Sequence, residues 1–225
     1  RMNSSMPKVL HEINGIPLAH FVIKTSKLLN PKKIILIVGY KKDLVKKSVK
    51  KFNIEFAEQN EQKGTAHAVE QCLSKLRGFS GDTLILSGDV PLISQNTLNQ
   101  LITLHQKNKS LASILSANII NPKGYGRIIR NNNNFIKIVE HKDANTEELK
   151  INEINSGIYI FDTKTLYNKI SLIKNNNIQG EYYLTDIFEF IDKNMISIYN
   201  TNHIEEINGI NTINQLNDIA HQLVK

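Results

Sequence analysis

Short apolar runs alternate with amphipathic stretches along the first half of the chain. Runs of this length are typical of buried strands, whereas apolar residues that recur every three or four positions indicate helices. The pattern predicts strands at 33–38 and 54–56 and a third that begins at Thr83, separated by helices at 17–29, 41–52, 66–76 and 94–106. Strands that alternate with helices form βαβ units, so we expect an α/β fold with a parallel sheet.

The second half of the chain mixes a hairpin with further strands and helices. Alternating segments at 126–130 and 135–141 flank the run Asn131–Asn134, whose residues tolerate the left-handed turn conformation, and this predicts the hairpin. The remaining pattern predicts strands at 112–119, 151–161 and 196–199 and helices at 163–170, 185–193 and from Ile213. No repeat with a period of about 20 to 50 residues is present, and no Pro/Ser-rich linker separates domains.

The segment from Thr83 to Ile93 carries the first chemical signal in the sequence. Its apolar run has the composition of a strand buried on both faces of a parallel sheet, and Pro91 cannot donate to a sheet ladder. Asp89 is therefore expected at the carboxyl end of a buried strand, which is the edge where ligands bind in open α/β sheets. A carboxylate there suits Mg²⁺ that carries substrate phosphates, and the alternative is an aspartate that caps the element after the strand.

The composition narrows the class of protein. The 225 residues are 40% hydrophobic and 22% charged, as in globular proteins, and no apolar run reaches the roughly 18 residues of a membrane span. No signal-peptide pattern precedes the first polar stretch, so a cytoplasmic protein without a membrane partner is expected. The single cysteine, Cys72, falls in a helical pattern and is expected to be a small buried hydrophobic residue rather than a nucleophile.

The formal net charge of +7 raises the question of a nucleic-acid partner. Lysines cluster between Lys41 and Lys51 on a predicted amphipathic helix, without interleaved aromatic residues and outside any recognisable nucleic-acid module. A charge run of this kind is typical of a solvated helix face. We therefore expect no nucleic acid among the partners.

A series of short motifs, taken together and in this order, resembles one enzyme family. The motifs are Pro7-Lys8-Val9-Leu10, Gln59 with Gly64-Thr65, Gly88-Asp89-Val90-Pro91-Leu92-Ile93, Gly124-Tyr125-Gly126-Arg127, Val139-Glu140-His141-Lys142-Asp143, Glu153-Ile154-Asn155-Ser156-Gly157, Gln179-Gly180-Glu181-Tyr182-Tyr183-Leu184-Thr185-Asp186 and Gly209-Ile210-Asn211. Over essentially its whole length the chain resembles the uridylyltransferase domain of the bacterial bifunctional N-acetylglucosamine-1-phosphate uridyltransferase / glucosamine-1-phosphate N-acetyltransferase family. The resemblance implies a Rossmann-like nucleotide-diphospho-sugar transferase fold, α/β, with a mixed, mostly parallel sheet and a smaller β-rich sugar-binding part.

The resemblance also implies a reaction and its partners. The phosphate of N-acetylglucosamine 1-phosphate attacks the α-phosphorus of UTP and gives UDP-N-acetylglucosamine and pyrophosphate, with Mg²⁺ as cofactor, in the supply of peptidoglycan and lipopolysaccharide. Two polyanions must meet in line, so positioning and charge neutralisation are expected to carry the catalysis. The implied organisation is a nucleotide-binding part at about 1–110, a sugar-binding part at about 111–212 and a closing helix at about 213–225.

The family's phosphate and metal positions fall on four residues of this chain. Asp89 and Asn211 match its Mg²⁺ ligands, and one carboxylate with one amide oxygen leaves the other octahedral positions to phosphates and water. Lys8 matches the lysine that meets the phosphates, and Arg1 ends the family's glycine-rich signature, where it also faces them. The resemblance thus implies Arg1, Lys8 and Asp89 as catalytic residues.

The family's nucleotide contacts fall on Gln59, Gly64 and Thr65, with Ser87 and Gly88 beside Asp89 as further substrate contacts. Gln59 has a donor and an acceptor on one amide, so it can pair with an edge of uracil. Gly64 lets the backbone approach the base where a side chain would intrude. Loop solvation and a helix cap are the alternative roles of Gln59 and Thr65.

The family's sugar contacts fall on Gly126, Glu140, Asn155, Tyr183 and Thr185. A carboxylate and an amide can clamp vicinal sugar hydroxyls, and a tyrosine can cover the ring or the acetyl group. His67 and His141 also lie inside motifs. We interpret both as structural, because the reaction needs no imidazole and no second ligand stands at zinc spacing.

The chain departs from the family pattern at both ends. The family's first strand and its Leu-x-x-Gly-x-Gly-Thr-Arg-Met loop should precede Arg1, and only Arg1-Met2 of that loop is in the sequence. For a polypeptide that begins at Arg1 we expect weak or absent transferase activity and a sheet with an unpaired interior edge. The family's hexapeptide-repeat β-helix is not among these residues, so acetylation of glucosamine 1-phosphate is not expected from them, and a homotrimer is implied only for a parent protein with that domain.

Three other functions stay open from the sequence: a pyrophosphorylase for another sugar nucleotide, an inactive sugar-nucleotide binding module, and a nucleic-acid binder. Gln59, Asn155 and the Gln-Gly-Glu-Tyr-Tyr segment argue against the first. Retention of Asp89 and Asn211 argues against the second, because binding alone has less need of a metal pair. The third would require a steep salt dependence of binding to DNA.

Overall fold

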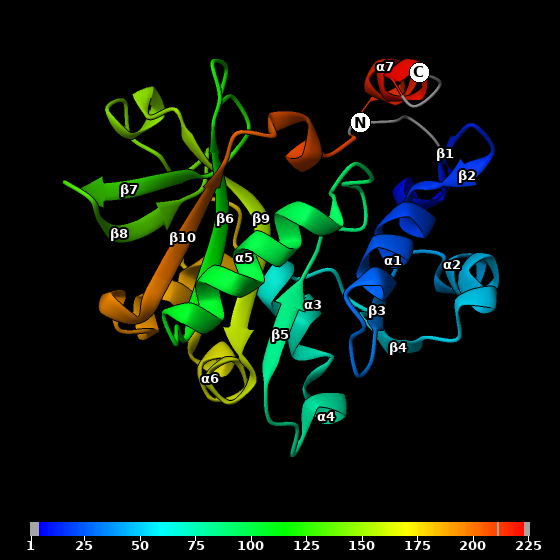
Figure 1. Ribbon diagram of the computed structural model, residues 1–225, viewed down its shortest axis with the longest axis horizontal. Coiled ribbons are helices and arrows are strands. Elements are labelled where there is room, and N and C mark those ends of the chain that lie inside the picture. Colours follow the sequence, from blue (N-terminus) through cyan, green and yellow to red (C-terminus); the bar gives the residue numbers. More distant parts are fainter. Residues whose placement is uncertain (1–4, 211, 223–225) are drawn as a thin grey trace.

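A six-stranded sheet lies at the centre of the computed structural model, which describes residues 5–210 and 212–222 (Figure 1). Its strands run in the order β10 (Ile196–Thr201), β6 (Ala112–Asn118), β9 (Glu153–Asp162), β7 (Arg127–Asn131) and β8 (Asn134–Val139), and β5 (Asp82–Ile85) also pairs with β9. β10 and β6 are parallel, whereas β9 runs antiparallel to β5, β6 and β7. The sheet is therefore mixed, and β9 joins most of its strands.

Two smaller sheets lie in the N-terminal part of the chain. β3 (Ile35–Val38) and β4 (Glu55–Glu58) pair in parallel, as expected for a βαβ unit, and β1 (Glu12–Ile13) pairs antiparallel with β2 (Ile16–Pro17). The predicted hairpin in the second half is confirmed as β7 and β8, and Asn132 in its turn has φ +54°. Asparagine is among the residues that adopt this left-handed conformation most readily.

The strand that begins near Thr83 differs from its prediction. β5 pairs antiparallel with β9, with Thr83 opposite Phe161, and its residues are only partly buried or exposed rather than buried on both faces. Within residues 5–210 and 212–222, β5 has no ladder partner on its other edge, and β3 pairs only with β4. An open edge of this kind leaves part of the strand in contact with solvent, which accounts for its incomplete burial.

Helices cover the central sheet and flank the two-stranded ones, with α5 crossing in front of the central sheet (Figure 1). The α-helices are α1 (Leu18–Leu28), α2 (Lys42–Val49), α3 (Thr65–Glu70), α4 (Leu73–Leu76), α5 (Gln95–Lys107), α6 (Thr163–Lys169) and α7 (Ile213–Gln222). Short 3-10 helices are η1 (Lys8–Leu10), η2 (Lys50–Phe52), η3 (Glu148–Lys150), η4 (Ile170–Leu172), η5 (Leu184–Phe190), η6 (Lys193–Met195) and η7 (Ile204–Ile207). α5 begins where predicted, because Ser94 Oγ accepts the N–H of Thr97 at 3.1 Å.

Two predicted helices take another form. The helix expected at 66–76 is divided into α3 and α4 by a turn at Gln71-Cys72. The helix expected at 185–193 is the 3-10 helix η5, whose buried side chains include Leu184, Ile187 and Phe188. The three-residue spacing of Leu184 and Ile187 matches the three residues per turn of a 3-10 helix.

The core occupies both faces of the central sheet because residues of β9 alternate between them. Tyr159 and Phe161 pack on one face with Phe188 of η5, and the Phe161 and Phe188 ring centroids are 5.4 Å apart. Ile158 and Ile160 pack on the other face with residues of α5. Cys72 lies in the first of these clusters, and burial raises the pKa of its thiol to about 11, so its prediction as a buried hydrophobic residue is confirmed.

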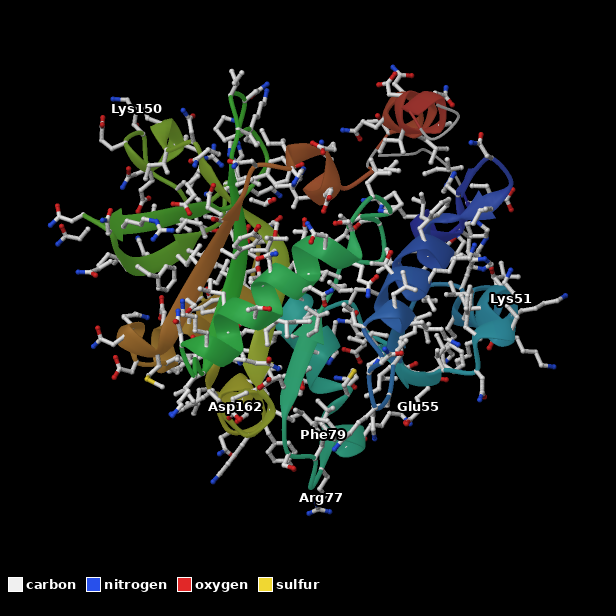
Figure 2. All side chains as sticks on the ribbon, in the orientation of Figure 1. Lys51, Glu55, Arg77, Phe79, Lys150 and Asp162 are labelled. Atoms are coloured by element: carbon white, nitrogen blue, oxygen red, sulfur yellow. The ribbon has the colours of Figure 1, made fainter. Side chains whose placement is uncertain are left out.

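Part of the basic surface around α2 is neutralised. Lys42 and Lys46 both form ion pairs with Glu58 on β4, whereas Lys51 projects away from the body of the molecule (Figure 2). This arrangement fits a solvated helix face. No helix in the described part of the chain is long and apolar enough to cross a membrane.

Candidate active site

Asp89 lies in the turn after β5, where three segments distant in sequence meet. Its carboxylate forms an ion pair with Lys8 Nζ, and both side chains are partly exposed. The carbonyl of Asp89 accepts the N–H of Ile210 at 3.0 Å, and a Cβ added to Gly209 would lie 3.7 Å from Asp89 Oδ2. The structure thus brings Lys8, Asp89 and residues 209–210 together at one end of β5.

Two predicted residues of this cluster, Arg1 and Asn211, lie outside the described residues. The alternative role of Asp89 as a cap of the following helix is wrong, because Ser94 caps α5. Gly88 packs closely against the N-terminal segment, since a Cβ there would lie 3.2 Å from Val9 Cγ1.

The side-chain amide of Gln59 is held by two contacts. Its Nε2 donates to the carbonyl of Gly64 at 3.0 Å and lies 3.1 Å from Nδ1 of His67. When Nδ1 of His67 acts as the acceptor, the two contacts use both N–H groups of the amide. They fix the direction of the Gln59 carbonyl oxygen, so His67 has the structural role predicted for it.

Gly64 is in close contact with the backbone of Tyr182. Its φ is +119°, and a Cβ at this position would lie 2.5 Å from the Tyr182 carbonyl oxygen and 2.6 Å from its nitrogen. Two backbone hydrogen bonds hold the segments together, from Tyr182 N to Lys63 O at 2.8 Å and from Ala66 N to Tyr182 O at 2.9 Å. The protein itself therefore requires glycine here, whatever part a bound base plays.

Thr65 extends the same contact. It is the first residue of α3, whose N-cap is Gly64, and its Oγ1 accepts the N–H of Leu184 at 2.9 Å. The alternative role of Thr65 as a helix cap is therefore wrong. Its hydroxyl ties the segment of predicted nucleotide contacts to the segment that carries Tyr183 and Thr185.

The predicted sugar contacts come from four places in the chain and converge. Glu140 comes directly after β8, and its Oε1 accepts a hydrogen bond from Thr185 Oγ1 in η5 at 3.1 Å. The carbonyl of Gly126, before β7, accepts the N–H of Asn155 in β9 at 2.9 Å, and a Cβ at Gly126 would lie 3.3 Å from Glu140 Oε2. These contacts place the Glu140 carboxylate and the backbone of Asn155 at one glycine, with the Thr185 hydroxyl on the carboxylate.

The electrostatics of this cluster favour neutral ligand groups. Burial raises the pKa of the Glu140 carboxyl, and the hydrogen bond from Thr185 acts in the opposite direction. Burial and the charges of Glu189 and Glu140 raise the pKa of Asp186 to about 6. Carboxylates accept hydrogen bonds and repel anions, so the cluster suits sugar hydroxyls better than a phosphate.

Tyr183 is nearly buried on the same segment. Its hydroxyl accepts a hydrogen bond from Gln179 Nε2 at 2.6 Å, and burial raises its pKa, with Gln179 acting against this. Ser87, two residues before Asp89, lies close to β9, because its Oγ would lie 3.5 Å from a Cβ at Gly157. Gly157 is two residues beyond Asn155, so the Asp89 cluster and the Glu140 cluster lie on neighbouring elements.

Residues 3–205, which include most of these positions, match the family model described as nucleotidyl transferase. The chain belongs to the nucleotidyl transferase family. The enzyme class predicted from the motifs is thereby confirmed.

Two curated relatives of this nucleotidyl transferase are both named Bifunctional protein GlmU. The one from Trichodesmium erythraeum (strain IMS101) is 43% identical over 236 aligned positions, which cover 100% of this chain and 50% of the relative. The one from Bacillus cereus (strain AH187) is 44% identical over 214 positions, which cover 94% of this chain and 46% of the relative. The chain spans about half the length of the curated relatives it matches, and the resemblance drawn from the motifs is confirmed.

A solved structure has the same fold. UDP-glucose pyrophosphorylase complexed with UDP-glucose superposes with a TM-score of 0.74 at 16% identity, over 97% of this chain and 90% of that chain. At this identity the likeness concerns the fold alone. It confirms the predicted α/β fold of nucleotide-sugar transferases.

The donor set of this nucleotidyl transferase fits one kind of metal site. The described part of the chain contains no group of three or more His, Cys, Asp or Glu side chains able to hold a metal. Asp89 offers a single, partly exposed carboxylate. A single carboxylate of this kind fits Mg²⁺ bound mostly by phosphate and water oxygens.

Two residues of the site had no assigned role in the sequence. Arg127 is 1% exposed, and its guanidinium donates to the carbonyls of Tyr125 and, at 3.5 Å, Leu149. Burial lowers its pKa. Its place beside Gly126 in a motif was the only signal. Tyr159, which bonds to Asn155, lies outside every motif and gave no signal.

Two surface hollows and one buried histidine in the described part of the chain lie apart from the predicted site residues. Two surface hollows of about 440 and 600 Å³ contain none of the predicted site residues. The larger is lined by residues that include Arg77, Phe79 and Asp162 (Figure 2). Asp162 pairs with Asp82 at the start of β5, whereas Asp89 follows the end of that strand. His105 contacts Ser113 at 2.8 Å, but Ser113 is fully buried and no substrate could reach it as a nucleophile.

Proposed function

We propose that this nucleotidyl transferase makes UDP-N-acetylglucosamine and pyrophosphate from UTP and N-acetylglucosamine 1-phosphate, with Mg²⁺ as cofactor. The supporting observation is the placement of a Lys8–Asp89 ion pair beside a carboxylate–amide cluster, through the approach of Ser87 to Gly157. The first group has an ammonium that can pair with phosphates and a carboxylate that can bind Mg²⁺. The second has the acceptors that sugar hydroxyls need.

At the phosphate end, Arg1 and Lys8 are proposed to neutralise the triphosphate. Asp89 and Asn211 would hold Mg²⁺, which when bound withdraws charge from the α-phosphate and orients it. A phosphate oxygen of N-acetylglucosamine 1-phosphate forms a bond to the α-phosphorus. The bond from that phosphorus to the bridging oxygen breaks, and its electron pair leaves with pyrophosphate, so the chain need form no covalent intermediate.

At the sugar end, Glu140 is proposed to accept hydrogen bonds from sugar hydroxyls. Thr185 holds Oε1 of this carboxylate, and Gly126 leaves room next to Oε2. Asn155, whose backbone N–H donates to the carbonyl of the same glycine, is proposed to contribute its side-chain amide. Ordering these groups before the substrate arrives lowers the entropy lost in binding.

At the base end, Gln59 is proposed to read an edge of uracil with its amide, which His67 and the Gly64 carbonyl hold in place. We infer that residues of about 1–110 bind the nucleotide and those of about 111–212 bind the sugar. We also infer that the enzyme acts in the cytoplasm and supplies peptidoglycan and lipopolysaccharide synthesis, and so the cell wall and cell shape.

The test is pyrophosphate release in the presence of Mg²⁺, from UTP or dTTP combined with N-acetylglucosamine 1-phosphate, glucose 1-phosphate or galactose 1-phosphate. It is run on residues 1–225 and on a version with a glycine-rich loop before Arg1. From the version with the loop we expect turnover with UTP and N-acetylglucosamine 1-phosphate. This turnover should be lost in Asp89→Ala and kept in the control Asp43→Ala, which changes an exposed aspartate of α2.

Two outcomes would contradict the proposal. Faster turnover with another nucleotide or hexose phosphate would indicate a pyrophosphorylase for a different sugar nucleotide. Binding of UDP-N-acetylglucosamine by the folded, loop-containing version without any pyrophosphate release would indicate a binding module.

A further inference from the structure

The hydroxyl of Tyr159 is placed against the amide of Asn155. Tyr159 is 4% exposed, and its ring packs in the core cluster with Phe161 and Phe188 at centroid distances of 5.9 and 5.5 Å. Its Oη accepts a hydrogen bond from Asn155 Nδ2 at 2.7 Å. The ring is therefore anchored in the core, and the hydroxyl is its one polar contact with the site.

A bulge in β9 makes this contact possible. In a regular strand, residues four apart are separated by roughly 13 Å. Here Asn155 pairs with Ser116 and Tyr159 pairs with Ile114, so the three residues of β9 between these pairs oppose a single residue of β6. Gly157, at φ +78°, lies inside the bulge. Bulges commonly redirect side chains next to functional sites, and this one lets Tyr159 reach Asn155.

The hydrogen bonds of Asn155 leave part of its amide available. Its Oδ1 accepts the N–H of Gly157 at 3.2 Å, and one N–H of Nδ2 goes to Tyr159. An asparagine amide has two donors and two acceptor positions, so one N–H and one lone pair are left for a ligand. The Gly157 N–H can only donate, so it fixes which end of the amide is Oδ1, and the Tyr159 hydroxyl, which accepts from Nδ2, holds the other end in place.

Tyr159 stays a neutral phenol under ordinary conditions. Burial raises its pKa, the charge of Glu140 raises it further, and the bond from Asn155 acts against this. As a neutral phenol it accepts the N–H of Asn155 Nδ2.

We propose that Tyr159 is a positioning residue, which orients the Asn155 amide for binding of the N-acetylglucosamine part of the substrate. This inference rests on the proposed function. Tyr159 does not touch the reacting atoms, so it acts on sugar affinity and leaves nucleotide affinity unchanged.

The test compares Tyr159→Phe with Tyr167→Phe by calorimetric titration with UDP-N-acetylglucosamine and with UTP. Tyr159→Phe keeps the ring in the core and removes only the hydroxyl, whereas Tyr167 is 40% exposed on α6. In Tyr159→Phe the buried Asn155 amide is left without its partner, and the affinity of the variant for UDP-N-acetylglucosamine should fall roughly five- to tenfold. We expect this loss for UDP-N-acetylglucosamine in Tyr159→Phe alone, with UTP binding equal in both variants.

A double-mutant comparison separates positioning from general loosening of the core. If Tyr159 acts through Asn155, adding Tyr159→Phe to Asn155→Ala weakens UDP-N-acetylglucosamine binding no further. An additive loss, or equal affinity of Tyr159→Phe and wild type, would overturn the inference. Wild type that binds UDP-N-acetylglucosamine but releases no pyrophosphate would overturn the proposed reaction and leave the role of Tyr159 to the binding data.

Discussion

Replacing Gly64 by alanine tests how the segment of predicted nucleotide contacts is joined to that of the sugar contacts. At φ +119° and ψ 177°, a residue with a Cβ is strained by about 1–3 kcal/mol. The new Cβ would also lie 2.5 to 2.9 Å from three backbone atoms of Tyr182. These atoms must move away, which breaks the two hydrogen bonds of Tyr182 to Lys63 and Ala66, each worth about 1 kcal/mol. The expected loss of unfolding free energy is about 3–5 kcal/mol.

The assay is equilibrium unfolding in urea, with Gly78→Ala as the matched control. Gly78 has φ +72°, yet a Cβ there meets no atom within 4 Å, so only the backbone strain of about 1–2 kcal/mol is expected. Equal losses in the two variants would refute the argument from close contact. Unchanged stability of Gly64→Ala with lost UTP binding would show that the glycine serves only the ligand.

Three further predictions concern charged groups of the site. Asp89→Ala should lower pyrophosphate release by orders of magnitude and leave the unfolding midpoint near that of wild type, because the carboxylate is partly exposed; unfolding of the variant would instead indicate a structural role. Glu140→Ala should raise KM for N-acetylglucosamine 1-phosphate about tenfold or more with KM for UTP unchanged, and an unaltered sugar KM would contradict the placement of the sugar site. Asp186→Asn should stabilise the protein at pH 7.5: the folded-state pKa of about 6 lies above the ordinary 3.8, so the charged form costs stability as pH rises through this window. Solvent screening of this half-buried group limits the increase in unfolding free energy to about 1–2 kcal/mol. Urea unfolding should show that the difference between variant and wild type disappears as pH falls toward about 4.

Local patterns in the sequence determined most of the elements. The helix after Ser94 and the hairpin around Asn132 formed where predicted, because a side-chain cap and a left-handed turn depend on a few adjacent residues. The βαβ unit of β3 and β4 followed from strand and helix periods alone. The motifs also identified the enzyme family, because their order along the chain is itself a property of the sequence.

Tertiary structure decided the partners of these elements. The apolar run at Thr83 has the same composition in a parallel or an antiparallel sheet, and only the position of β9 made β5 antiparallel and partly exposed. Likewise, the sequence shows that Gly64 lacks a side chain, but the reason lies in Tyr182, far along the chain. The bond between Asn155 and Tyr159 depends on a bulge, which is set by pairing with β6. Periodicity therefore determined what each segment forms, and long-range contacts determined what each segment does, because sequence patterns carry no record of which distant surfaces meet.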